Sequence, residues 1–287
     1  MFPPVDTKDP TAVASFVADK LQHMHPGASV AWLNKVFRNI EDLFTGRLPD
    51  YLAIDLHYHD LEHTLQATVC LSLLLDGRHR AGAQPQLGPR QIELALAAAL
   101  LHDTGYLKLR SDVAGTGAKY TYHHVLRSCA FAAGYLPGVG GNEQEIEIVL
   151  NAIKCTGPTK EIGHLHFENP IGCVIGSAVG TADYLGQMAA QDYPNELEIL
   201  YDEFREADEF VHVQPSNRTF KSASDLIERT PCFWQQFVRR KLEVDFQGMY
   251  RFLAHPYPDG PNRYLEAVEA NIAEISRRIG CPSTAAQ

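Results

Sequence analysis

Histidine and aspartate residues at three separate places in this 287-residue chain have the types and spacing of a metal centre. In the stretch "LHYHDLEHTLQ", His59 and His63 are four residues apart, and on a helix such residues face the same way. His102 and Asp103 directly follow the apolar run "AAALL", and Asp183 stands alone in "VGTADYLGQM". Imidazole nitrogens and carboxylate oxygens together suit divalent metal ions. The three places together therefore predict one metal centre.

Each place has a simpler interpretation when it is taken alone. His59 and His63 could belong to the solvated start of a helix, and a histidine such as His102 is favoured at a helix C-terminus. Asp183 could be a surface residue, although a carboxylate among small apolar residues is rarely buried without a partner. The metal centre is predicted from the combination of these residues.

The elements that would position these residues are predicted to be helices. Apolar residues recur at helical spacing in segments such as "SVAWLNKVFRNIEDLF", "PRQIELALAAALLHD" and "PNELEILYDEFREADEF". Alternation typical of strands is scarce, and "EFVHVQ" near Val211 is the only plausible short strand. We therefore predict an all-α fold with a helical extension over residues 1–50, a metal-binding core over 51–190, and a helical portion packed on the core over 191–287.

The apolar stretch "IGCVIGSAVGTADYLGQMA" is predicted to be a packed helix and not a membrane span. It carries Asp183 past its middle, and no basic flank follows it. Gly172, Gly176 and Gly180 fall four residues apart, so they would line one helical face and let a neighbouring helix approach closely. That contact would fix the position of Asp183.

The charge and cysteine content narrow the functional classes. The chain is 45% hydrophobic and 21% charged with a formal net charge of −10, which argues against a protein that grips long nucleic acid through its phosphates. The six cysteines are scattered without a C-x-x-C pair, a pattern that favours free thiols in a reducing compartment. We expect a cytoplasmic protein without membrane contact, and its oligomeric state stays open.

The order His63, then His102 and Asp103, then Asp183 resembles the H…HD…D signature of the HD superfamily of metal-dependent phosphohydrolases. The resemblance covers roughly residues 51–190 and implies an HD-domain helical bundle with additional N- and C-terminal helices. The stretch "YHDLEH" is similar to the Y-H-N-x-x-H stretch of the cyclic-nucleotide phosphodiesterase branch, with Asp60 where that branch has Asn.

The resemblance implies a role for each matching residue. The first metal ion would be bound by His63, His102, Asp103 and Asp183, and Asp103 would bridge to a second ion. His59 matches the histidine that serves as general acid in the phosphodiesterase branch. His124 stands four residues before Ser128, as in the family's H-x-x-x-[S/G] helix, where the histidine can bind the second metal.

Other positions depart from the family pattern or add to it. Thr156 in "AIKCTG" stands where many dinuclear members have a further histidine. Tyr106 stands where the HD-GYP hydrolases have Lys, which makes that subfamily an unlikely match. Lys108 and Arg127 could bind the phosphate of a substrate. The loop histidines His164 and His166 could border the site.

The function expected from the resemblance is hydrolysis of a phosphoester of a nucleotide-like small molecule, either a phosphodiester or a phosphomonoester. One or two divalent ions (Mn, Mg, Fe, Ni, Zn or Co) would lower the pKa of bound water from about 15.7 toward about 7 and supply hydroxide. Asp103 would fix the ions, and His59 would donate the proton that the leaving oxygen needs. Two alternatives stay open: an HD-fold di-iron oxygenase, and an HD domain that senses a nucleotide without hydrolysing it.

Overall fold

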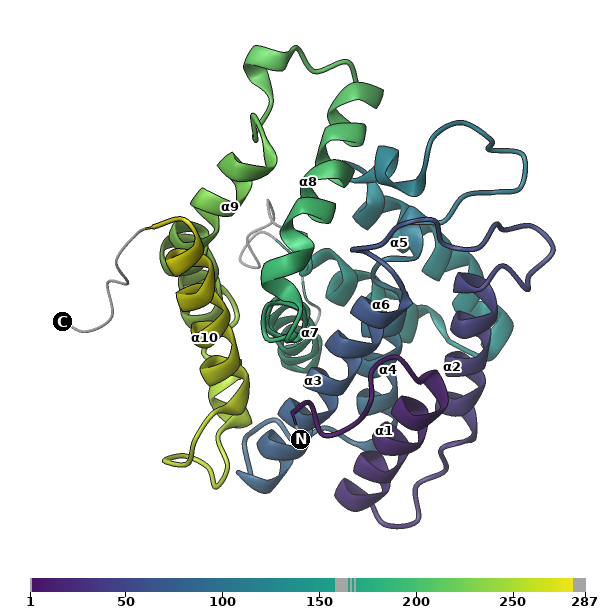
Figure 1. Cartoon of the computed structure of the whole chain (residues 1–287). Coiled ribbons are helices and arrows are strands. Elements are labelled where there is room, and N and C mark those ends of the chain that lie inside the picture. The colour runs from purple at the N-terminus through teal and green to yellow at the C-terminus, as the bar shows by residue number, and fades with distance from the viewer. Residues whose placement is uncertain (1, 158–164, 166, 168, 281–287) are drawn as a thin grey trace.

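The computed structural model describes residues 2–157, 165, 167 and 169–280, and these residues form helices joined by turns, without a strand. Their α-helices are α1 (Pro10–Met24), α2 (Ala31–Phe44), α3 (Leu61–Arg80), α4 (Pro89–Leu101), α5 (His124–Tyr135), α6 (Glu143–Lys154), α7 (Pro170–Met188), α8 (Tyr193–Phe210), α9 (Ala223–Cys232) and α10 (Arg263–Arg278) (Figure 1). The prediction of an all-α fold is confirmed.

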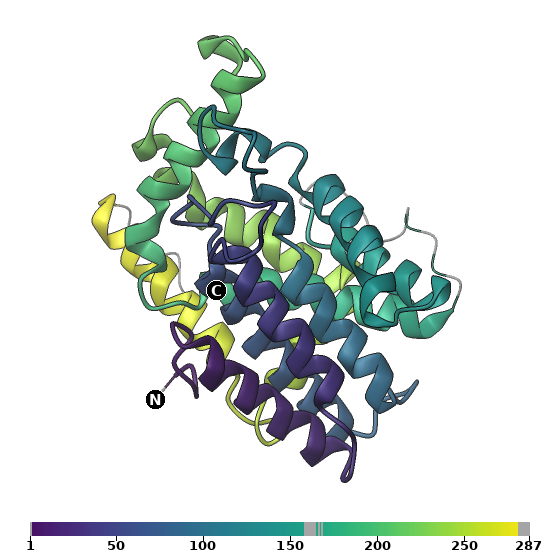
Figure 2. The ribbon, with the colours of Figure 1, turned by 90° about the vertical axis from the view of Figure 1, so that its right-hand side faces the viewer.

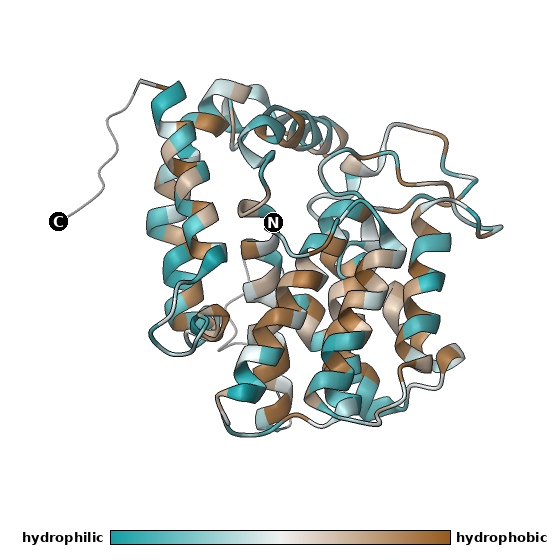
Figure 3. Ribbon diagram, turned by 60° about the horizontal axis from the view of Figure 1, so that its bottom comes forward, coloured by the Kyte–Doolittle hydropathy of each residue, from teal (hydrophilic) through white to brown (hydrophobic). Residues whose placement is uncertain are grey.

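Helices α3 and α7 form the centre of the molecule. They pack against each other along their length, and α1, α4, α6 and α10 surround them. Gly186 permits the closest approach, since a Cβ atom there would lie 2.8 Å from Cα of Ala67 on α3. In Figure 2 the N-terminal helices lie side by side as a layer along one flank. In Figure 3 the central helices carry long apolar stretches, whereas the outer helix α10 alternates between apolar and polar residues.

The predicted close packing along the glycine face of α7 is present in the structure. A Cβ atom at Gly176 would lie 2.7 Å from Sγ of Cys155 at the end of α6, and one at Gly180 would lie 2.5 Å from the ring of Phe246. A side chain at either position would push α7 away from its neighbours. The glycines therefore hold α7, and Asp183 with it, against the core.

The start of α3 differs from the prediction that placed His59 and His63 on one helical face. The helix begins at Leu61, and its N-cap is Asp60, whose side chain accepts a hydrogen bond from the backbone N–H of His63 over 2.9 Å. His59 precedes the cap and lies in the bend before the helix. Asp is among the residues that cap helices best, so Asp60 fixes the start of α3 at Leu61.

The short strand predicted near Val211 is also wrong. Helix α8 continues to Phe210, and Val211 caps its C-terminus. The next residue, His212, has a φ angle of 58°, which turns the chain away from both helix and strand. Helix α8 thus ends at Phe210, where the predicted segment "PNELEILYDEFREADEF" also ends, and turns follow it in place of a strand.

The C-terminal elements contact the predicted core directly. Helix α10 lies against α7 and α8, and the 3-10 helix η8 (Met249–Leu253) packs on α3 and α7. Among the described residues, no helix is both long enough and apolar enough to cross a membrane.

Candidate metal centre

Four side chains from three separate parts of the chain meet between α3, α4 and α7. Nε2 of His63 on α3 and Nε2 of His102 after α4 each lie 3.2 Å from Oδ2 of Asp103. Oδ1 of Asp183 on α7 lies 3.4 Å from Nε2 of His63 and 3.3 Å from Nε2 of His102. All four residues are buried. The structure thus brings together the residues predicted to bind the first metal ion.

The hydrogen bond on the far side of His102 fixes the direction of its lone pair. Its Nδ1 lies 2.7 Å from the carbonyl oxygen of Ala99, which can only accept, so Nδ1 carries the hydrogen. In the neutral ring the Nε2 lone pair then points at Asp103 and Asp183. Oδ2 of Asp103 is buried and has no hydrogen bond among the described residues. A cation among these electron-rich atoms would satisfy all of them at once.

Burial and charge act against each other on these groups. Burial disfavours the charged form of His63, but Asp103 and Asp183 outweigh it and raise the pKa of His63 to about 9. Burial likewise opposes ionisation of Asp183, but His102 and His63 outweigh it and lower the pKa of Asp183 to about 2. The site therefore favours positive charge between its carboxylates, as a proton or as a metal ion.

The second oxygen of Asp103 faces a different histidine. Its Oδ1 lies 3.7 Å from Nε2 of His124, the first residue of α5. Nδ1 of His124 donates to the carbonyl oxygen of Thr121 over 2.6 Å, so the Nε2 lone pair is turned toward Asp103. The carboxylate of Asp103 thus lies between the first group and His124, which is the arrangement that a bridging ligand requires.

His59 stands beside this centre and is held by a residue that the sequence did not reveal. Its Nδ1 donates to Oε2 of Glu203 over 2.6 Å, and Oε1 of Glu203 accepts from the backbone N–H of Tyr58 over 2.9 Å. Because Nδ1 carries the hydrogen, Nε2 is the free end of the ring. The signal available in the sequence was that Glu203 stands four residues before Ala207, so the two share one face of the acidic helix, and the structure buries both.

Tyr106 is a second residue of the site that sequence reasoning did not assign. Its ring stacks on His59 at 4.6 Å and 21°, and on His124 at 4.5 Å and 12°. The tyrosine is almost completely buried. The Tyr106 ring therefore lies between His59, the predicted general acid, and His124, the predicted ligand of the second metal, and sets the spacing of the two histidines.

Helix α8 also holds the loop that leads to His124. Glu206 accepts from the backbone N–H of Thr116 over 2.5 Å and from the hydroxyl of Thr116 over 2.6 Å. Tyr122 donates its phenol hydrogen to Asp208. One helix outside the predicted core thus fixes both His59 and the segment before His124.

Lys108 and Arg127 have structural partners. Nζ of Lys108 lies 2.8 Å from Oδ2 of Asp55. Arg127 donates to the carbonyl oxygens of Gly105 over 2.6 Å and Leu107 over 2.9 Å. Both cations stabilise the loop after Asp103 through these contacts. Their binding of a phosphate group stays a prediction.

Three further residues were singled out in the sequence: Thr156, His164 and His166. The hydroxyl of Thr156 donates to the carbonyl oxygen of Ile153 over 2.8 Å, the normal bond of a threonine at a helix end. His164 and His166 lie outside the described residues. Within the described part of the chain, only His63, His102 and Asp103 form a group of possible ligand atoms within 4.8 Å of one another.

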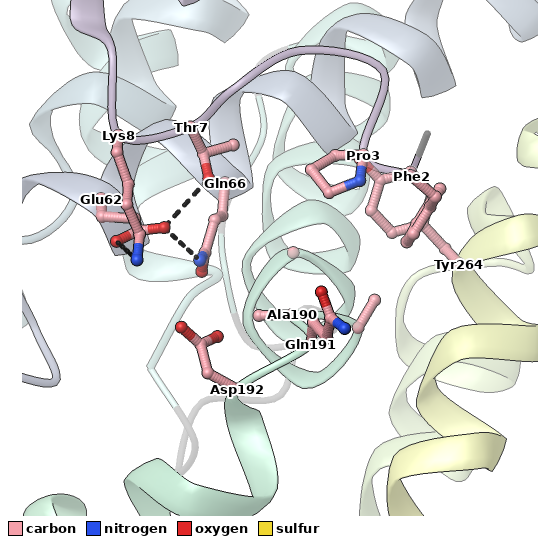
Figure 4. Close-up of a pocket in the computed structure, with 12 residues that line it drawn as sticks. Phe2, Pro3, Thr7, Lys8, Glu62, Gln66, Ala190, Gln191, Asp192 and Tyr264 are labelled. Carbon is pink, nitrogen blue, oxygen red and sulfur yellow. Dashed lines mark hydrogen bonds and ion pairs between the residues drawn. The ribbon is translucent and has the colours of Figure 1, made fainter.

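A hollow lies on another side of the first turn of α3 and includes none of these ligands (Figure 4). The N-terminal segment covers it, and Tyr264 of α10 closes one side. Glu62 and Asp192 both border the hollow, and Nζ of Lys8 lies 3.8 Å from Glu62. The metal centre is thus separate from this hollow.

Searches against protein-family models and curated protein sequences found no match to this chain.

Proposed function

We propose that this protein is a metal-dependent phosphohydrolase of the HD superfamily. The observation that supports the proposal is the meeting of His63, His102, Asp103 and Asp183 around one point, in the order and residue types of the H…HD…D signature. The chemistry of the donors fits a divalent ion, because two imidazole nitrogens and two carboxylates suit Mn, Fe, Ni, Zn or Co, while Mg prefers oxygen ligands.

The first ion would be held by those four residues, and a second by Asp103 and His124. When bound, such ions lower the pKa of a water molecule and neutralise the charge of a phosphate group. Oδ2 of Asp103, which accepts no hydrogen bond, and the outward hydrogen bonds of His102 and His124 support this assignment. These bonds orient the rings before any ligand arrives, so little ordering is needed on binding.

His59 would donate the proton that the leaving oxygen of the ester requires. An imidazole can exchange a proton near neutral pH, and the free Nε2 of His59 is on the side away from Glu203. Glu203 would stabilise the protonated ring through its negative charge. The stacked ring of Tyr106 would keep His59 from rotating out of position.

The proposed substrate is a small, nucleotide-like phosphomonoester or phosphodiester. A net charge of −10 disfavours long nucleic acid, and burial of the ligand residues suits a small ester. We also propose that the protein is cytoplasmic, because Cys70, Cys129 and Cys155 are buried free thiols.

The test is hydrolysis of bis-(p-nitrophenyl) phosphate, p-nitrophenyl phosphate and a nucleotide panel with each of the six metals. His59→Ala should retain bound metal and lower turnover by about 10²–10⁴-fold. The control is His57→Ala, which changes an exposed histidine two residues away. Bound iron with O₂ consumption and no ester cleavage would favour the oxygenase, and nucleotide binding without turnover would favour the sensor.

A further inference from the structure

Arg78 in the last turn of α3 is a buried cation without a partner. The residue is 3% exposed, and its Nε has no hydrogen bond. Among the described residues, Arg78 has neither an ion pair nor a hydrogen bond from its guanidinium group. A guanidinium group has N–H donors around its whole rim, and here none has an acceptor.

Other buried cations of the chain show how unusual this is. Lys108 pairs with Asp55 at 2.8 Å, and Lys119 pairs with Asp112. Both lysines are buried to a similar degree as Arg78. The fold thus supplies a carboxylate where it buries these ammonium groups, and it supplies none for Arg78.

The cost of this burial cannot be avoided by loss of a proton. Burial lowers the pKa of Arg78, yet a guanidinium group stays charged at any physiological pH. The carbonyl end of α3 offsets part of the charge but leaves the N–H donors unbonded. The helix end is also fixed in place, because a Cβ atom at Gly77 would lie 1.8 Å from the carbonyl oxygen of Phe252.

The nearest carboxylate in sequence serves other cations. Oδ2 of Asp76 lies 3.1 Å from Nζ of Lys20 and 3.4 Å from Nε of Arg80. Residues two apart on a helix point about 200° apart, so Asp76 lies on the opposite side of α3 from Arg78. Lys20 and Arg80 share this one carboxylate, so Asp76 balances only one of their two positive charges. In a chain of net charge −10, this end of α3 is locally cationic.

We propose that Arg78 is the anchor of a binding site for a phosphate-type oxyanion. The planar fork of a guanidinium group matches two oxygens of such an anion, and charge-assisted hydrogen bonds of this kind are the strongest that arginine makes. The other cations of the helix end favour an anion with more than one negative charge over a simple monoanion.

This site is distinct from the metal centre. Arg78 is 15 residues beyond His63 on the same helix, and a rise of about 1.5 Å per residue puts about 22 Å between them. The inference does not depend on the proposed function. Since α3 carries both residues, an anion bound by Arg78 at its C-terminal end would stabilise the helix that holds the predicted ligand His63 at its N-terminal end.

The test is thermal unfolding and calorimetric titration with inorganic phosphate and pyrophosphate, at constant ionic strength with chloride as reference. Asp103→Asn serves as the background, so that phosphate bound at the metal centre does not contribute. In this background we expect saturable binding and a rising Tm. Adding Arg78→Met should weaken binding more than tenfold and raise the Tm in chloride, because it removes an unpaired buried charge. Adding Arg47→Met, at an exposed arginine paired with Asp42, should leave binding unchanged.

Three results would overturn the proposal: no saturable stabilisation by either anion, equal binding with and without Arg78, or a response to citrate as strong as to pyrophosphate. Arg78→Lys covers the case in which Arg78→Met does not fold. It keeps the charge but loses the planar fork, so binding should weaken while the fold is retained. Unchanged binding in Arg78→Lys would also contradict the role of the guanidinium fork.

Discussion

Glu203 accepts a hydrogen bond from Nδ1 of His59 over 2.6 Å, across 144 residues of sequence. The other oxygen of the same carboxylate accepts the backbone N–H of Tyr58, so Glu203 fixes both the ring and the peptide before it. Glu203 belongs to α8, which lies outside the stretch that carries the H…HD…D order. The C-terminal part of the chain therefore completes the candidate site.

Replacing Glu203 by Gln tests whether this carboxylate serves His59. An amide cannot stabilise a protonated imidazole as a carboxylate does, so we expect kcat to fall by about 10–100-fold, with bound metal unchanged. The basic limb of the kcat profile against pH, where a general acid loses its proton, should shift to lower pH, which loss of packing alone would not cause. Glu209→Gln, at an exposed position of the same helix, is the control. A normal kcat and pH profile in Glu203→Gln would contradict the assignment.

The bond from Glu206 to Thr116 predicts a local change in mobility. Glu206→Gln loses the negative charge that accepts from both the N–H and the hydroxyl of Thr116. Hydrogen bonds to charged groups contribute about 1.5–3 kcal/mol, so amide exchange over residues 112–123 should become roughly tenfold faster or more. Hydrogen exchange with mass spectrometry measures this, with Glu198→Gln as the matched control. Equal acceleration throughout α4 would indicate global destabilisation instead.

Glu196 predicts a specific dependence of stability on pH. Burial, with Asp192, Asp60 and Glu62 nearby, raises the pKa of Glu196 from 4.5 to about 7. The folded state therefore holds this proton more tightly than the unfolded state, and stability falls as pH rises from 4.5 to about 7. Glu196→Gln removes the loss of stability that accompanies ionisation of this carboxyl group.

The variant should be more stable than the wild type by about 1 kcal/mol above pH 7, after allowance for solvent screening. The two proteins should converge below pH 4.5, where the carboxyl group is protonated in both states. Urea unfolding at a series of pH values measures the difference. A gain that is the same at every pH would show that the charge of Glu196 is not its cause.

Part of the structure followed from local patterns. Helical spacing of apolar residues predicted the all-α fold. The polar pair after an apolar run pointed to His102 and Asp103, and the lone carboxylate in a helix of small residues pointed to Asp183. The position of His59 did not follow, because the cap at Asp60 decides where α3 begins, and a periodic pattern does not register a cap. Glu203 and Tyr106 were missed because their contacts depend on tertiary packing across more than forty residues or on ring stacking.

The glycine face of α7 gives a prediction about packing. Gly180→Ala would place a Cβ atom 2.5 Å from the ring of Phe246 and 2.9 Å from the carbonyl oxygen of Cys155. We expect a loss of about 1–3 kcal/mol in the free energy of unfolding, and weaker metal binding because Asp183 is three residues away. Gly134→Ala in α5 meets nothing within 4 Å and should stabilise the protein slightly. Equal effects of the two substitutions would contradict the close packing of α7.

The central claim is that the carboxylate of Asp103 and its neighbours bind a divalent metal ion, and elemental analysis after equilibrium dialysis measures it most directly. The wild type and Asp202→Asn, an exposed aspartate on α8, should each retain at least one equivalent of Mn, Fe, Ni, Zn or Co. Asp103→Asn should weaken binding by more than about 100-fold. Wild-type protein that retains none of these metals, or an Asp103→Asn variant that retains as much as the wild type, would contradict the account.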